Sequence, residues 1–264
     1  MHSLFTFDML KLLAPALAAG YLVALTHVPL GREVLNRGIV FLDLAVAQVA
    51  GLGAVMASAL FDWSGPMAQI PAFIAAMLAA LIFSKLERFG QTIQEACIGC
   101  AFVLAASLAI LMFAGDPHAG EGMSSLLAGQ ILWVQWPSLL VAGLIYVLIA
   151  GCLFLYPVIA QRHFYALFAL SITLSVQLVG VYLVFASLIL PALVALNRPG
   201  RQGLLVGYAV SAAAVTGGLI VSVISDLPSG PVLVCSYITV AVVIYAFKRL
   251  NMLKFLIRLL NCCL

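Results

Sequence analysis

The stretch FYALFALSITLSVQLVGVYLVFASLILPALVALN, residues Phe164–Asn197, contains no charged residue. As one α-helix it would be about 50 Å long, well beyond the roughly 30 Å of a bilayer's hydrocarbon core. Gly180, close to the amide of Gln177, is the natural place for a break, and Pro191 disturbs the second half again. The stretch therefore predicts a helix that breaks or folds back. Gln177, Gly180 and Pro191 are predicted to form the hinge and wall of a path through the molecule.

The composition excludes a water-soluble domain. Hydrophobic residues make up 65% of the 264 residues, charged residues make up 8%, and the mean hydropathy is +1.22. These values predict an all-α, polytopic membrane protein with a single transmembrane domain over residues 1–264. The net charge of +3 comes from basic residues between apolar segments, which argues for topology rather than for nucleic-acid binding.

The apolar segments have the lengths that membrane spans require, and their number predicts eight or nine crossings, one of them short or re-entrant. They cover residues 10–30, 38–60, 67–84, 93–114, 136–156, 164–180, 182–197, 203–225 and 231–247.

Basic and acidic loops alternate along the chain. Lys and Arg are expected on the cytoplasmic side. The alternation holds only if Phe164–Asn197 crosses twice, so the charges predict a folded-back hairpin, an outer amino terminus and a cytoplasmic carboxyl terminus. A tail over about 248–264 is expected to form a short amphipathic helix on the inner leaflet. The basic residues of the loops and tail are Arg32, Arg37, Lys85, Arg88, Arg162, Arg198, Arg201, Lys248, Arg249, Lys254 and Arg258.

Asp43 and Glu95 are acidic residues inside or at the edge of predicted spans, where charges are costly and mark functional candidates. An acid in the first turn of a helix, favoured by the helix dipole, is an equally good interpretation of each. Gln48 lies deeper, roughly 140° round the helix from Asp43, so the two are not expected to grip one ion together. A hydrogen bond from Gln48 to a neighbouring helix is at least as plausible as a role in a path.

Other candidates have weaker signals. Cys97 and Cys100 share a helical face, but no further ligands are evident nearby, so buried cysteines are favoured over a metal site. His118 and Glu121, spaced i, i+3 in the longest outer loop, could catch a divalent cation, although a solvated loop is the favoured interpretation. His27 is expected at the cytoplasmic interface.

The sequence contains no Walker A segment, no HExxH motif and no hydrolase-type catalytic set. The chain is therefore not expected to be an enzyme. A transporter of this kind takes its energy from an ion gradient or from another subunit.

Several stretches together resemble the zinc/manganese permease family, the membrane subunits of metal-uptake ABC transporters. VQLVGVYLV (Val176–Val184) followed by LILPA (Leu188–Ala192) is similar to that family's most distinctive signature. Three further regions agree with the family pattern, in the right order and spacing: Glu95–Gly99, Ala128–Leu132, and Thr216–Gly218 with Asp226–Pro231.

The resemblance implies a homodimeric pore in the bacterial inner membrane, a cytoplasmic ATP-binding subunit and an extracytoplasmic metal-binding protein. The cargo would be Zn²⁺ first and Mn²⁺ next, with no permanently bound cofactor. Asp43, Gln48 and Glu95 are then the predicted path residues. His118, Glu121 and Asp226 are the predicted residues of the outer mouth.

Two features depart from the family pattern. Members commonly carry an Asp and a His four residues apart on the second span, and these slots fall on Leu44 and Gln48 here. The cytoplasmic segment that docks on the ATPase is reduced to Pro157–His163. The alternative hypothesis is a gradient-driven carrier or a non-transporting membrane partner, and the presence or absence of neighbouring ATPase and binding-protein genes would separate the two.

Overall fold

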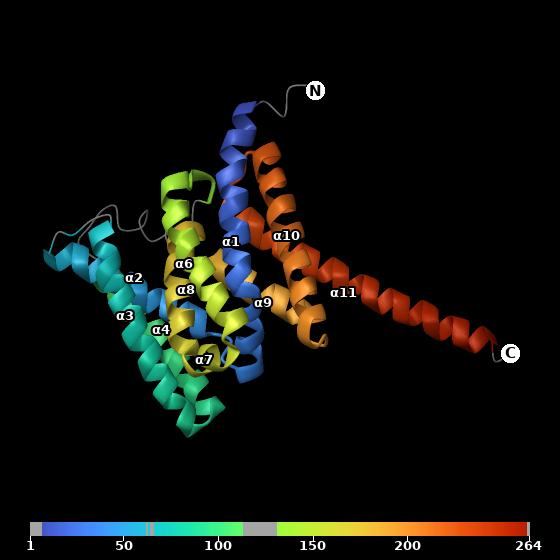
Figure 1. The fold of residues 1–264 in the computed structure, drawn as a ribbon, viewed down its shortest axis with the longest axis horizontal. Coiled ribbons are helices and arrows are strands. Elements are labelled where there is room, and N and C mark those ends of the chain that lie inside the picture. Colours follow the sequence, from blue (N-terminus) through green and yellow to red (C-terminus); the bar gives the residue numbers. More distant parts are fainter. Residues whose placement is uncertain (1–6, 62, 64–65, 113–130, 263–264) are drawn as a thin grey trace.

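The computed structural model describes residues 7–61, 63, 66–112 and 131–262, and this part of the chain is all-helical (Figure 1). Seven helices are long and apolar enough to cross a membrane, and two shorter apolar helices accompany them, which agrees with the predicted eight or nine crossings. The elements are α1 (Phe7–Arg37), α2 (Leu42–Phe61), α3 (Pro66–Leu86), η1 (Glu87–Phe89), α4 (Gln91–Met112), η2 (Ile131–Trp133), α6 (Trp136–Leu155), α7 (Pro157–Arg162), α8 (Phe164–Val179), α9 (Val181–Val194), α10 (Gly200–Ser225) and α11 (Ser229–Cys262).

Helix α1 is the centre of the fold, because α6, α8, α9 and α10 all pack against it (Figure 1). Small residues allow this close approach, as is usual between helices in a membrane. A Cβ atom at Gly31 would overlap the carbonyl oxygen of Leu188 on α9, and one at Gly20 would lie 2.6 Å from the Val215 side chain on α10. The glycines of α1 therefore determine how near its neighbours can come.

Helices α2, α3 and α4 form a second group, which α8 joins to the central helices, while α11 packs on α9 and α10. Large apolar side chains on α3, α4 and α6 are exposed, as expected for surfaces that face lipid. Helix α11 extends away from the other helices (Figure 1) and continues through the tail to Cys262. The separate short helix that the sequence predicted for the tail is therefore replaced by one continuous helix.

The predicted hairpin is confirmed. Gly180 has φ 82° and separates α8 from α9, a left-handed backbone conformation that suits glycine. Near the start of α8, the Arg37 guanidinium lies over the Phe164 ring at 4.5 Å. Just beyond the end of α9, Arg32 donates hydrogen bonds to the carbonyl oxygens of Arg198 and Gly200. Because Arg32 and Arg37 both end α1, the two arms of the hairpin begin and end on the same side of the protein.

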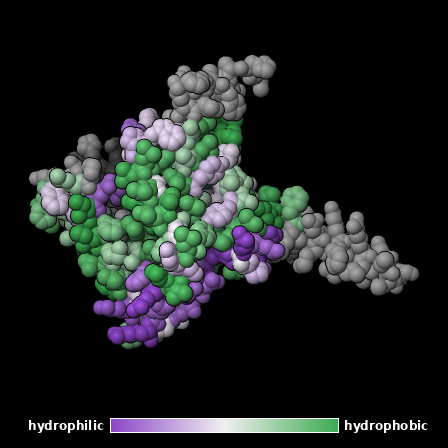
Figure 2. Space-filling view, viewed as in Figure 1, coloured by the Kyte–Doolittle hydropathy of each residue, from purple (hydrophilic) through white to green (hydrophobic). Residues whose placement is uncertain are grey.

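The hydrophilic residues gather at that same end, the lower end in Figure 2, while apolar residues cover the flank of the helices. Arg37 joins three segments there: its guanidinium pairs with Glu33 at 2.8 Å and Glu87 at 3.1 Å, and it lies 3.5 Å from the Gln161 carbonyl oxygen. The alternation of basic and acidic loops therefore corresponds to a real polarity of the molecule.

Candidate functional site

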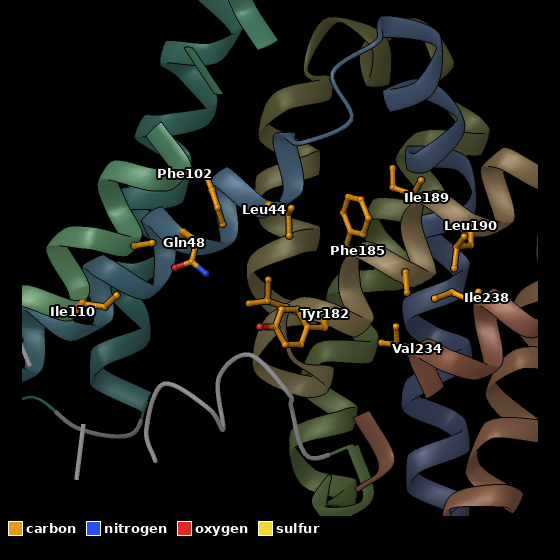
Figure 3. Close-up of a pocket in the computed structure, with 13 residues that line it drawn as sticks. Leu44, Gln48, Phe102, Ile110, Tyr182, Phe185, Ile189, Leu190, Val234 and Ile238 are labelled. Atoms are coloured by element: carbon orange, nitrogen blue, oxygen red, sulfur yellow. The ribbon is translucent and has the colours of Figure 1, made fainter. Parts of the chain in front are cut away.

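A cavity of about 510 Å³ lies between α2 and α4 on one side and α9 and α11 on the other (Figure 3). Its volume is in the range of small-molecule binding sites. The residues that line it are mostly apolar: Leu44, Gln48, Phe102, Ala106, Ile110, Val181, Tyr182, Phe185, Ala186, Ile189, Leu190, Val234 and Ile238.

Helix α9 supplies the largest share of the wall. Five of its six lining residues, Tyr182, Phe185, Ala186, Ile189 and Leu190, follow the i, i+3, i+4, i+7, i+8 spacing that places side chains on one face of a helix. This set is called the front face of α9 below. The opposite side of α9 packs on α1. The second arm of the hairpin is therefore a thin partition between the cavity and the centre of the protein.

The amide of Gln48 and the hydroxyl of Tyr182 are the hydrogen-bonding side-chain groups among the described lining residues. Figure 3 shows Gln48 on the α2 side, with the Tyr182 ring directed toward it across the cavity. Leu44 lies one turn before Gln48 and lines the same space. The two positions where the resembled family carries Asp and His therefore both face the cavity, and here they present an apolar side chain and a neutral amide.

Asp43 faces elsewhere. It is in the first turn of α2 and only 1% exposed, and both its carboxyl oxygens are buried without a hydrogen-bond partner among the described residues. Burial of a carboxylate without a partner is costly, so this position is unusual even for a helix amino terminus. The structure separates Asp43 from Gln48, as the 140° angle predicted, and leaves its role as a path residue a prediction.

Glu95 is partly buried on α4 and does not line the cavity. It lies seven residues before the lining residue Phe102, and residues at this spacing share a helical face. Glu95 is therefore on the cavity side of α4 but nearer the hydrophilic end. Of the three predicted path residues, only Gln48 reaches the cavity itself.

The residues predicted for the hinge and wall have separate positions. Gly180 makes the break between α8 and α9, whereas Pro191 lies buried inside α9, which continues to Val194. Gln177 is exposed, and neither it nor Pro191 lines the cavity. The front face of α9, whose residues the sequence interpretation did not name, supplies much of the cavity wall. The signal was present in the aromatic and aliphatic residues spaced three and four apart after Gly180.

Asp226, which was predicted for the outer mouth, is an exposed residue with φ 54° that follows the last residue of α10. His118 and Glu121 lie outside the described residues. Within the described residues, no group of three or more His, Cys, Asp or Glu side chains is placed to hold a metal. Cys97 is partly buried and Cys100 is exposed, and both are free thiols.

His27 was expected at the interface, and the structure corrects this: its side chain is 0% exposed and lies within the span of α1. Its Nδ1 is 2.8 Å from the hydroxyl of Ser187 on α9, and its Nε2 is 2.9 Å from the hydroxyl of Ser175 on α8. The Tyr146 hydroxyl of α6 is 2.7 Å from Ser175. One imidazole thus joins both arms of the hairpin to α1, and we call His27, Ser175 and Ser187 the imidazole bridge.

A second polar contact lies beside the bridge. The hydroxyl groups of Thr26 on α1 and Ser171 on α8 are 3.0 Å apart, and both residues are 0% exposed. The signal for these contacts is the i, i+4 spacing of Ser171 and Ser175 within an apolar helix, since hydroxyl residues in spans commonly bond to neighbouring helices.

The short helix α7 presents apolar side chains at the hydrophilic end. Val158 is 79% exposed and Ile159 is 52% exposed. A pocket of about 140 Å³ lies beside α7, between it and α1, and is lined by Pro29, Leu30, Glu33, Leu153, Pro157, Ala160, Gln161 and Phe164. The reduced segment before Phe164 therefore still forms a helix with an unpartnered apolar side.

Comparison with known proteins gives a consistent result. A family model described as the ABC 3 transport family matches residues 9–161 and 155–248. The high-affinity zinc uptake system membrane protein ZnuB of Haemophilus influenzae is 24% identical over 269 residues, which cover 92% of this chain and 100% of that protein. The manganese transport system membrane protein MntC of Halalkalibacterium halodurans is 27% identical over 251 residues, with 86% and 85% covered.

Among solved structures, PsaBC from Streptococcus pneumoniae in complex with Fab contains a similar chain. The TM-score is 0.68 at 20% sequence identity, with 90% of this chain and 93% of that chain covered. At this identity the likeness concerns the fold.

Proposed function

We propose that this chain, which belongs to the ABC 3 transport family, imports a divalent transition metal. Zn²⁺ is the first candidate cargo and Mn²⁺ the second. Permeases of this family work with a separate ATPase subunit. A permease of this family is a multi-pass protein of the bacterial plasma membrane. The observation that carries the proposal is the family match along nearly the whole chain. The order of the metals is supported by the zinc-system relative, which is covered over its full length.

The cavity beside α9 is the proposed path. Its place between two helix groups, and its wall made from one arm of a hairpin with Gly180 at the turn, suit a site that changes shape as access alternates. An apolar wall with one amide and one phenol offers weak ligands to a divalent cation, which prefers charged oxygen, imidazole or thiolate groups. Transit with brief contacts, rather than tight coordination, is therefore the proposed mode of passage.

Two copies are proposed to assemble around a shared path, because the front face of α9 is an apolar wall that one chain leaves incompletely covered. Helix α7 is the proposed contact for the ATPase, supported by its exposed Val158 and Ile159 at the hydrophilic end. Arg37 of α1 contacts both α7 and η1 there, so a movement of α7 would displace the end of α1 as well.

The test uses the full chain together with the ATPase subunit that co-purifies with it and with an extracytoplasmic metal-binding protein, reconstituted in proteoliposomes. We expect ATP-dependent uptake of radioactive Zn²⁺, with competition by Mn²⁺, and no uptake when a proton or sodium gradient replaces ATP. Uptake driven by the gradient alone would favour the carrier alternative. Absence of uptake under both conditions, from a complex that hydrolyses ATP, would reject the proposed cargo.

The same assay tests the predicted path residues. Asp43→Ala and Glu95→Ala are expected to lower the uptake rate, Asp43→Ala more strongly because its carboxyl group is buried. Uptake of both metals at the unmodified rate in both variants would contradict the assignment.

A further inference from the structure

The imidazole bridge holds the helix that forms the cavity wall. Among the described residues, the contact between His27 and Ser187 is the one side-chain hydrogen bond that joins α9 to another helix. Ser187 is 2% exposed and lies roughly 130° round α9 from the centre of the front face. The bridge therefore holds α9 from the side that faces away from the cavity.

The bridge is located where a displacement of α9 would have the greatest effect. At its start, α9 is joined to α8 through Gly180 alone, a residue whose backbone can swivel. At its end, the chain is fixed by Arg32, which bonds to the carbonyl oxygens of Arg198 and Gly200. Ser187 is midway between these points, next to the lining residue Ala186.

A count of protons indicates that the bridge competes with hydrogen bonds from the serines to their own backbone. The Ser175 hydroxyl lies 2.7 Å from the Ser171 carbonyl oxygen, and the Ser187 hydroxyl lies 3.0 Å from the Val184 carbonyl oxygen. A hydroxyl group has one proton, and a neutral imidazole has one N–H and one acceptor nitrogen. One of the two serines must therefore turn its proton from its own backbone toward the ring, so the bridge can be weakened or rearranged at one arm while the other arm stays bonded.

We propose that His27 is a positioning residue for transport, which sets the resting position of α9 through Ser187 while Ser175 keeps the ring attached to α8. This inference rests on the proposed function, because it takes the cavity beside α9 to be the path. A neutral hydrogen bond inside a protein shifts an equilibrium by about two- to tenfold. The bridge is therefore strong enough to bias the position of the wall and weak enough to open in each cycle.

The test measures the position of α9 without any partner protein. The full chain, with its native cysteines replaced by alanine and with Ala186→Cys as a reporter, is placed in lipid nanodiscs. Ala186 lines the cavity but is only 3% exposed, so the reporter reacts slowly with a water-borne charged methanethiosulfonate while the wall is in place. Adding Ser187→Ala is expected to raise the reaction rate about three- to tenfold.

Ser171→Ala is the matched control. It also removes a buried serine hydroxyl that bonds to α1, through Thr26, but among the described residues that hydroxyl makes no hydrogen bond to α9. Its reaction rate is expected to stay within about twofold of the parent. His27→Ala is expected to act as Ser187→Ala does, and His27→Gln, which keeps a donor and an acceptor, is expected to restore part of the slow rate.

An unchanged rate in Ser187→Ala, or an equal rise in Ser187→Ala and Ser171→Ala, would overturn the proposal, and Ser187→Ala decides this even if His27→Ala does not fold. The uptake assay separates this result from the proposed function. A faster reporter in Ser187→Ala together with no metal uptake by the parent complex would reject the cargo and leave the positioning role in place. Metal uptake by the parent complex, together with an unchanged reporter rate in Ser187→Ala, would support the proposed cargo and reject the positioning role of His27.

Discussion

The two sides of α9 are built from different chemistry. The side toward α1 is buried and held by the Ser187 hydroxyl bonded to His27, with Gly31 allowing backbone contact at Leu188. The front face carries Tyr182, Phe185 and Ile189 toward a cavity, and the Tyr182 side chain is 51% exposed. A single helix of the hairpin thus has one side attached to α1 and one side that lines the cavity.

The difference shows where polar groups are useful in this protein. Behind α9, the hydroxyl groups of Ser187, Ser175 and Tyr146 each have a partner on another helix, as is usual for buried polar groups. In front of α9, the polar groups Gln48 and Tyr182 stand among apolar neighbours. Changes behind the wall are therefore expected to affect stability and position, whereas changes in front are expected to affect what binds.

The largest expected effect comes from filling the contact behind α9. In Gly31→Ala the new Cβ would overlap the Leu188 carbonyl oxygen, a backbone atom that cannot turn aside. We expect a loss of about 3 kcal/mol in unfolding free energy, seen as a lower thermal midpoint in detergent. Gly51→Ala on α2 is the control, because no atom lies within 4 Å of its added Cβ. Equal midpoints for the two variants would show that α1 and α9 do not pack this closely.

The next effect is a gain of binding in front of α9. Leu44→Asp combined with Gln48→His places a carboxylate and an imidazole one turn apart on the cavity side of α2. We expect the affinity for Zn²⁺ to rise about a hundredfold, or roughly 2.7 kcal/mol, by equilibrium dialysis of the purified chain. Leu44→Asn with Gln48→His serves as the uncharged control. A double variant that binds no better than the parent would place Leu44 and Gln48 outside the site that accepts ions.

A smaller effect separates two tyrosines. Tyr146→Phe removes the hydroxyl that contacts Ser175 behind the wall, and the expected cost is about 1 kcal/mol of unfolding free energy. Tyr182→Phe removes a hydroxyl in front of the wall and is expected to change stability by less than about 0.5 kcal/mol. The thermal midpoints of the two variants, measured side by side, test the division directly, and a larger loss in Tyr182→Phe would contradict it.

The smallest effect is expected at Gln177, which is exposed on α8 and does not line the cavity. Gln177→Ala should leave the unfolding free energy within about 0.5 kcal/mol. ATP-driven uptake of Zn²⁺ should also be unchanged. Reduced uptake at normal stability would show that Gln177 contributes to the path after all, as the sequence first suggested.

Local signals predicted the fold well. Helix length, loop charge and one glycine were sufficient for the span count, the hairpin and its turn at Gly180, because these depend on bilayer thickness and on neighbours in the chain. The direction in which each helix faces depends on partners far away in the sequence. For this reason Gln177, the most polar residue of the hairpin, was predicted for the hinge and wall, whereas the cavity-lining residues of the front face of α9 were not identified.

The same limit applies to His27. The nearby Pro29 suggested a residue at the cytoplasmic interface, while the actual partners of His27 are 148 and 160 positions later in the chain. Asp43 shows the opposite case. Its place in the first turn of α2 agrees with one of the two interpretations, and its separation from Gln48 was predicted, but the sequence alone could not indicate that its carboxyl group is buried without a hydrogen-bond partner among the described residues.

The long separation between His27 and its serines has a consequence for biogenesis. Helix α1 leaves the ribosome first and enters the bilayer with its imidazole unpaired, and the polar partners on α8 and α9 are synthesised more than a hundred residues later. An unpaired polar group in hydrocarbon is costly, and the hydrogen bonds that form when the hairpin inserts remove this cost. The insertion of α8 and α9 therefore supplies the hydrogen-bond partners of His27. In a nascent chain truncated before Ser175, α1 would be held in the membrane only weakly.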